Sequence, residues 1–257
     1  MKIKLKNTSI SLLPLAVVLL VLLIWYVVTA TGIVPRFFLP GPFDVLVAFE
    51  EDFDLLMANM WVTLVEAFWG LLLGVILGVS IAIIMERFDL LYRAIYPLLV
   101  LSQTIPTYAI APILILWFGY GILPKVLLII VTTFFPVAVE MLTGLRSADQ
   151  DLIKLMQTMG SNRLQILWYV KLPASLEHFF ASLRISVSYS IIGAVIAEWV
   201  GGDAGLGVYM TRVMKVYAYD KMFAVIVLIS LVSLCLILAV DLVQRLAMPW
   251  KRGEKAL

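Results

Sequence analysis

The sequence predicts an all-α protein that crosses a membrane with six helices. Hydrophobic residues make up 63% of its 257 residues and charged residues only 14%, whereas a soluble domain carries about 25% charged residues. Several apolar stretches are long enough to cross the hydrocarbon layer, which takes roughly 20 helical residues. Helices are expected because an open strand in lipid leaves backbone groups unpaired, and the alternation of a barrel strand is absent.

Six apolar stretches are predicted to span the membrane within a single transmembrane domain, residues 1–257. The first follows a basic start, as a signal peptide would. We expect it to be retained, because its apolar run exceeds the roughly 7–15 residues of a signal peptide and no small-residue cleavage site follows. The spans run approximately over residues 10–30, 61–85, 92–118, 122–142, 179–200 and 222–246.

The distribution of Lys and Arg predicts the orientation, since cytoplasmic loops are enriched in these residues. With the N-terminus in the cytoplasm, 14 of the 19 Lys and Arg residues fall in cytoplasmic segments, Lys2 and Lys255 among them. The opposite orientation reverses this bias. Both termini are therefore predicted to be cytoplasmic. The external segments hold Arg36, Lys125, Arg212, Lys215 and Lys221.

The longest cytoplasmic segment, residues 146–178, is patterned as two short helices. Ser147 and Gln150 form a capping-box pattern at the start of the first helix. Its apolar residues then recur with helical spacing, at Leu152, Leu155, Met156 and Met159.

Gly160 is placed to end this first helix in a left-handed conformation. Ser161 or Asn162 can cap the second helix, and Pro173 is expected to stop it. Two short helices lying on the membrane surface without a partner would show the same pattern. A loose connector would not need it.

Candidates for a translocation path lie mostly in the third span. Pro97, Pro106 and Pro112 interrupt this helix, and such breaks survive in a membrane where neighbouring helices or a water-filled cavity satisfy the freed carbonyls. The polar side chains near the middle break either line a solute route or bond between helices. The path candidates are Ser102, Gln103, Thr104, Pro106 and Tyr108, with Glu198 at the far end of the fifth span.

Other patterns bear on packing and chemistry. Gly70, Gly74 and Gly78 recur every four residues, which favours close packing of the second span against another helix. No G-x-x-x-x-G-K-[ST] loop is present, so the energy for transport must come from another subunit or an ion gradient. One His and one Cys make an enzyme site improbable. We expect no catalytic, metal-binding or cofactor-binding residue in this chain.

The cytoplasmic segment resembles the signature of binding-protein-dependent ABC importer permeases, which reads Glu-Ala-Ala, three residues, Gly, nine residues, Ile-x-Leu-Pro. Here Gly160 is followed, after nine residues, by Val170–Pro173, while Lys154–Met156 replace Glu-Ala-Ala. Further runs resemble the subgroup that imports sulfonates, taurine, nitrate or the pyrimidine precursor of thiamine, the last branch most of all. These runs are Leu39–Pro42, Gln103–Pro106, Ala111–Pro112, Trp117–Gly121, Ala197–Trp199 and Gly205–Gly207.

The resemblance implies an importer-type permease fold that moves a small organic solute by alternating access. Two permease chains, expected to be identical, would form one pathway in the lipid bilayer. Two cytoplasmic ATPase subunits, which use ATP and Mg, would bind beneath them, and an extracytoplasmic binding protein would deliver the solute. No nucleic acid is expected as a partner.

The segment between the fourth and fifth spans would then be the coupling loop that contacts the ATPase. Its polar residues are candidates for direct contact, and its methionines could adapt to a groove. The candidates are Asp149, Asp151, Lys154, Met156, Gln157, Met159, Gly160, Asn162, Arg163, Leu172 and Pro173. The alternative is an ion-coupled secondary transporter, which would show inverted repeats and ionisable groups near the midplane; neither is convincing here.

Overall fold

The computed structural model describes residues 4–252, and every regular element in that range is a helix. Backbone contacts divide the chain into two compact units. Within the described residues, the smaller unit holds 4–57 together with 209–228, and the larger one holds 58–208 and 229–252. Lys2 and Lys255, which the orientation prediction includes, lie outside the described residues.

The helices confirm the all-α membrane fold. Within the described residues, five helical stretches are long and apolar enough to cross a membrane, and a sixth span results if α4 and α5 are counted together. These elements coincide with the six predicted spans and mostly extend them. The five are α1 (Lys4–Ala30), α3 (Phe53–Arg87), α6 (Ile122–Arg146), the stretch Arg163–Gly201 that ends with α9 (Leu172–Gly201), and α11 (Tyr219–Ala247).

The third predicted span is broken into α4 (Asp89–Ser102) and α5 (Thr107–Phe118), which are bent by 99°. Of the three prolines expected to interrupt it, only Pro106 lies at the break, at the N-cap of α5. Pro97 and Pro112 lie inside α4 and α5. The residue before a proline is biased away from helical geometry, which places the break immediately before Pro106.

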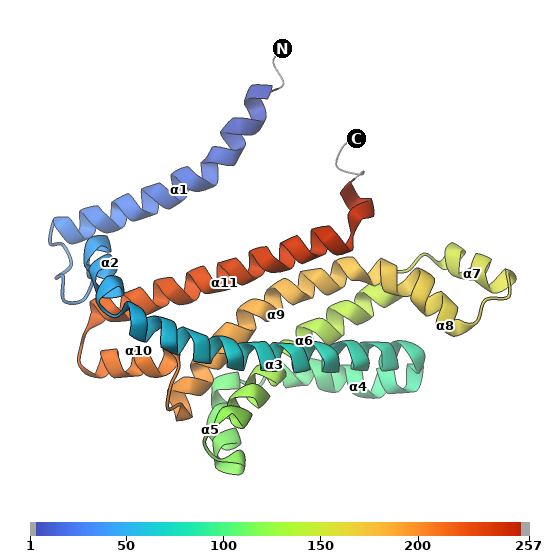
Figure 1. Cartoon of the computed structure of the whole chain (residues 1–257). Coiled ribbons are helices and arrows are strands. Elements are labelled where there is room, and N and C mark those ends of the chain that lie inside the picture. Colours follow the sequence, from blue (N-terminus) through green and yellow to red (C-terminus); the bar gives the residue numbers. More distant parts are fainter. Residues whose placement is uncertain (1–3, 253–257) are drawn as a thin grey trace. The chain divides into compact units, whose positions relative to one another are not determined.

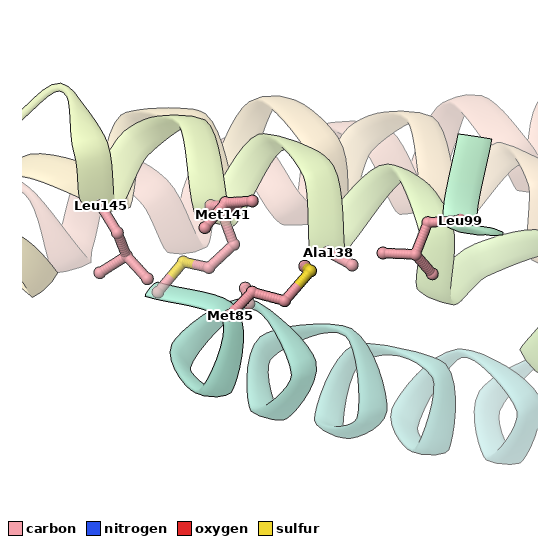
Figure 2. Packing of buried hydrophobic residues seen from close by; sticks show 7 residues of the cluster. Met85, Leu99, Ala138, Met141 and Leu145 are labelled. Carbon is pink, nitrogen blue, oxygen red and sulfur yellow. The ribbon is translucent and has the colours of Figure 1, made fainter. Parts of the chain in front are cut away.

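The core of the larger unit forms where α3, α4 and α6 meet. Met85 of α3 extends toward Ala138 and Met141 of α6, and Leu99 of α4 lies against the same helix (Figure 2). Farther along, α6 and α9 pack side by side (Figure 1). These helices form the frame that carries both the loop and the cavity described below.

The glycines of α3 lie against α6. A Cβ at Gly70 would be 2.4 Å from Ile129 Cβ, one at Gly74 would be 2.1 Å from Thr133 Oγ1, and one at Gly78 would be 2.7 Å from the Phe134 carbonyl oxygen. No side chain fits at these distances. The prediction of close helix packing is therefore confirmed.

The smaller unit centres on α2 (Pro42–Glu51) and the junction that follows it. Val45 and Ala48 of α2 are buried against Ala224. At the junction, Asp52 accepts a hydrogen bond from the Tyr209 hydroxyl at 2.6 Å and one from the Lys221 ammonium at 2.9 Å. The bond from Tyr209, and then that from Lys221, lowers the pKa of Asp52 below its ordinary 3.8.

Gly78→Ala should destabilise the protein, because the added Cβ meets a backbone carbonyl that cannot move cheaply. Overpacking of this kind costs about 1–3 kcal/mol. Thermal unfolding of the purified protein measures it. Ser80→Ala, at an exposed position of the same helix, is the control and should have little effect; equal melting temperatures for both variants would contradict the packing.

Asp52→Asn should lower the melting temperature at pH 7, because it removes a carboxylate bonded to Tyr209 and Lys221. Since the folded-state pKa lies below 3.8, the carboxylate's contribution is complete above about pH 4 and is lost as pH falls through the folded value. The difference from wild type should therefore shrink in acid. Glu50→Gln, an exposed carboxylate of α2, is the control, and a pH-independent difference for Asp52→Asn would count against this view.

Candidate functional site

The predicted coupling loop contains α7 (Gln150–Thr158) and α8 (Arg163–Ile166). Asp149 caps α7, since its carboxylate accepts the Asp151 N–H at 2.8 Å. The prediction that Ser147 caps this helix was wrong, because the Ser147 hydroxyl donates to the Gly144 carbonyl at 2.9 Å. The reason is that α6 runs to Arg146, so Ser147 belongs to the end of that helix.

Gly160 ends α7 as predicted, with φ at +81°. Its N–H donates to the Gln157 carbonyl and the Ser161 N–H donates to the Met156 carbonyl, both at 3.0 Å. This pair of bonds is a Schellman motif, which requires a left-handed residue that glycine adopts without strain. A Cβ at Gly160 would meet nothing within 4 Å, so the backbone conformation alone restricts this position.

Asn162 caps α8 through a reciprocal pair of bonds. Its side chain accepts the Gln165 N–H at 2.8 Å, and its own N–H donates to the Gln165 side chain at 2.7 Å. This is a capping box. Of the two caps that the sequence allowed, the structure has Asn162.

The second helix does not stop at Pro173, which corrects the sequence prediction. A π-helical turn, Leu167–Lys171, joins α8 to α9, and Pro173 lies in the first turn of α9. Because the π-helical turn precedes it, Pro173 stands within a continuous helical backbone, where it has no N–H to donate to the preceding turn. The chain is therefore helical from Arg163 to Gly201, and the second arm of the loop continues into a membrane-spanning helix.

The inner faces of the loop helices pack on one another. Ala148, Ile153 and Ile166 are buried there, with Met156 and Val170 partly buried beside them. The sequence predicted that Leu152, Leu155, Met156 and Met159 form the apolar face of α7. Only Met156 packs inward, and the buried residue of this helix, Ile153, was not predicted. Large apolar side chains remain exposed on the loop and its continuation, namely Leu152, Leu155, Met159, Leu164, Trp168 and Tyr169.

A cavity of about 760 Å³ lies between the loop and the end of α3. Gln157, Asn162 and Arg163, three of the predicted contact residues, line it together with Glu86 and Lys171, which form an ion pair with each other. Of the other predicted residues, Asp149, Asp151, Lys154 and Met159 are exposed, and Met156 packs inside the loop. Gly160 ends α7, and Leu172 and Pro173 begin α9.

A second cavity, of about 180 Å³, lies at the break between α4 and α5. Two path candidates, Ser102 and Gln103, line it, with side chains from α5, α6 and α9. Thr104, Pro106 and Tyr108 are exposed and do not line it. Thr132 and Gly193, which do, were not singled out in the sequence, because only the fold brings α6 and α9 to this break.

Glu198, the last path candidate, belongs to a buried network and does not line this cavity. It is 1% exposed. Its carboxylate accepts the Thr63 hydroxyl at 2.7 Å and the Gly207 N–H at 2.6 Å. A Cβ at Gly205 would lie 2.2 Å from the Glu198 carboxyl carbon, so the loop backbone passes directly over this group.

Side chains of α3 complete the network. The Leu206 N–H donates to Thr63 Oγ1 and the Gly205 N–H donates to Asn59 Oδ1, each at 2.9 Å. Nearby, Lys125 of α6 and Glu66 of α3 form a buried ion pair at 2.6 Å. The pair was not predicted from the sequence, because Lys125 was assigned to an external segment. The available signal was one acidic residue in the second predicted span and one basic residue at the start of the fourth.

Glu198→Ala should loosen the turn from α9 into the helix Leu206–Lys215, because it leaves the buried Gly207 N–H without its acceptor, whereas the Thr63 hydroxyl keeps the Asn59 carbonyl at 3.2 Å. Each buried group left unpaired costs about 1–3 kcal/mol. Hydrogen exchange at the amides of residues 205–207 should accelerate. Glu140→Gln, which alters the half-exposed pair with His178, is the control and should leave these amides unchanged; unchanged exchange in Glu198→Ala would contradict the assignment.

Comparison with known proteins identifies the family. Residues 70–253 match the model described as "Binding-protein-dependent transport system inner membrane component". A probable ABC transporter permease protein of Haemophilus influenzae is 38% identical over 89% of this chain and 93% of its own length. The formylaminopyrimidine transport permease protein ThiX of Halalkalibacterium halodurans is 33% identical over 97% of this chain and 100% of its own length. The taurine transport system permease protein TauC of Escherichia coli is 30% identical over 97% of this chain and 92% of its own length.

The fold agrees with these sequence matches. An inward-facing structure of the methionine ABC transporter MetNI superposes with a TM-score of 0.68 at 21% identity, covering 76% of this chain and 97% of that one. This likeness concerns the fold alone. The chain is therefore a multi-pass membrane protein that belongs to the binding-protein-dependent ABC importer permeases, within the group that contains the formylaminopyrimidine and taurine permeases.

Proposed function

We propose that this chain moves a small organic solute across the cytoplasmic membrane by alternating access, and that the segment from Asp149 to Lys171 couples it to an ATPase. The observation that carries the proposal is the unbroken helix from Arg163 to Gly201. A stiff helix that starts in a surface loop and ends across the membrane can transmit a displacement from one to the other.

The contacts of this helix indicate what moves with it. Lys171 is paired with Glu86 near the end of α3, and α9 packs along α6. A push on the loop would therefore shift α3, α6 and α9 together as a rigid group, which is a common form of switching between two packings. Gly160 separates the two arms and lets α7 take its own orientation.

The exposed apolar side chains of the loop suit a groove on the ATPase. Leu155 is 55% exposed and Met159 is 76% exposed. Methionine adapts its shape to an irregular apolar surface. Asp149, Asp151 and Lys154 flank these residues on the exposed surface of α7 and supply polar contacts around them.

The remaining partners follow from the family. Two ATPase subunits hydrolyse ATP with Mg, and this chain binds neither. A second copy of the chain completes the pathway, and an extracytoplasmic binding protein delivers the solute. Both termini lie in the cytoplasm, and no nucleic acid takes part. Relatives named for formylaminopyrimidine, taurine and aliphatic sulfonates support a small organic cargo, such as a thiamine pyrimidine precursor, taurine or another aliphatic sulfonate. Nitrate, an inorganic anion, enters only through the resemblance of the sequence runs.

Gly160→Val tests the coupling assignment. A β-branched residue is strained at a φ of +81°, by about 1–3 kcal/mol, so the hinge should distort. We expect the chain to insert normally, but ATP-dependent uptake in proteoliposomes with its ATPase and binding protein should fall at least several-fold, as should co-purification of the ATPase.

Thr143→Val is the matched control, because it places the same side chain at an exposed helical position of α6, outside the proposed coupling segment. It should transport as wild type does. Equal uptake per inserted molecule in Gly160→Val would refute the hinge. Uptake by this chain alone, driven by an ion gradient without any ATPase, would instead favour a secondary transporter.

A further inference from the structure

We propose that the cavity at the α4–α5 break selects uncharged solutes that donate hydrogen bonds from N–H groups, such as amino-substituted nitrogen heterocycles, over sulfonates and other anions. The inference rests on the proposed function, because it takes this cavity as part of the solute's path. Ser102, Thr132 and Gly193 are the residues that determine the preference.

The cavity is built from four helices of the larger unit. Ser102 and Gln103 come from the end of α4, Thr107 from the start of α5, Thr132 from α6 and Gly193 from α9. Its volume of about 180 Å³ is below the roughly 300–1,000 Å³ of pockets for drug-sized ligands. This volume suits a small solute.

Two of its hydroxyl groups present acceptors to the cavity. The Ser102 hydroxyl donates to the Leu99 carbonyl at 2.7 Å, and the Thr132 hydroxyl donates to the Ile129 carbonyl at 2.8 Å. A hydroxyl carries one proton and two lone pairs. With each proton used on its own helix, these oxygens can only accept a bond from a solute.

Gly193 leaves the Thr132 oxygen accessible. A Cβ at this position would lie 3.3 Å from Thr132 Oγ1 and 3.5 Å from Ile129 Cγ1. Any side chain there would cover the acceptor from the side of α9. The small residue thus gives a solute N–H room to approach.

Charge is absent from the lining, whose ten residues include no Lys, Arg, Asp or Glu. A sulfonate carries a full negative charge and only acceptor oxygens. Here it would lose hydration without gaining a cation, and it would face the Ser102 and Thr132 acceptors. An uncharged amino group instead can donate to the Ser102 and Thr132 oxygens, and it costs less to desolvate than a charged group.

The rest of the lining suits a flat ring with mixed polarity. Ile192, Ile196 and Val131 provide apolar surface, and Tyr189 adds an aromatic ring. The Gln103 amide can both donate and accept, so it can pair with a ring nitrogen or an exocyclic group. A nitrogen heterocycle satisfies both kinds of surface.

Equilibrium dialysis tests the preference with the assembled importer in nanodiscs, permease chains and ATPase together, without the binding protein. The probes are radiolabelled 4-aminopyrimidine and ethanesulfonate at millimolar concentration. Wild type should retain the aminopyrimidine in preference to the sulfonate. Thr132→Val should reduce that retention by about fivefold, the effect of one lost hydrogen bond, and Ser102→Ala should act in the same direction.

Two further variants make the test specific. Thr132→Ser keeps the hydroxyl and should restore retention. Thr143→Val removes an exposed hydroxyl of α6 that likewise bonds its own helix, at 2.9 Å from the Val139 carbonyl, and should behave as wild type.

The proposal is overturned if ethanesulfonate is retained as well as the aminopyrimidine, if neither is retained above the level of Thr132→Val, or if Thr132→Val and Thr143→Val behave alike. The proposed function fails separately, and only if the ATPase does not co-purify or uptake does not need it. A coupled importer that prefers ethanesulfonate would leave the proposed function standing and refute this preference alone.

Discussion

The hydrocarbon layer offers no partner to a backbone N–H or C=O group, and this constraint explains where the helices of this chain break. At the α4–α5 break, the hydroxyls of Ser102 and Thr104 donate to carbonyls of the preceding turn. After α9, the N–H groups of Gly205 and Gly207 bond to Asn59 and Glu198. Each break is thus placed where polar side chains take over bonds that a helix would make.

The same constraint also bears on the stretch Arg163–Gly201, where the helix does not break. Pro173 lies in the first turn of α9, and the π-helical turn directly before it joins that helix to α8 without a break. Such turns occur often at functional sites. In this chain the turn keeps a surface loop and a long membrane helix in one piece, which is the mechanical requirement for coupling to a separate motor.

Packing between the long helices combines small residues with one buried pair of charges. Gly70, Gly74 and Gly78 bring α3 close to α6, and Lys125 and Glu66 join the same two helices. Loss of one partner would leave an uncompensated charge, which costs about 3–5 kcal/mol. These contacts fix α3 against α6, which is the rigidity that the proposed coupling requires.

The sequence by itself determined the all-α class, the approximate spans and the end of α7 at Gly160, and it narrowed the cap of α8 to Ser161 or Asn162, because apolar length, backbone conformation and capping are local properties. It misjudged Ser147 and Pro173, since both depend on how far the neighbouring helices extend. The pairing of Lys125 with Glu66, the role of Glu198 and the grouping of Thr132 and Gly193 with Ser102 were decided only by the tertiary structure. Each joins residues from separate helices, and the depth and rotation of a helix are set by its packing partners.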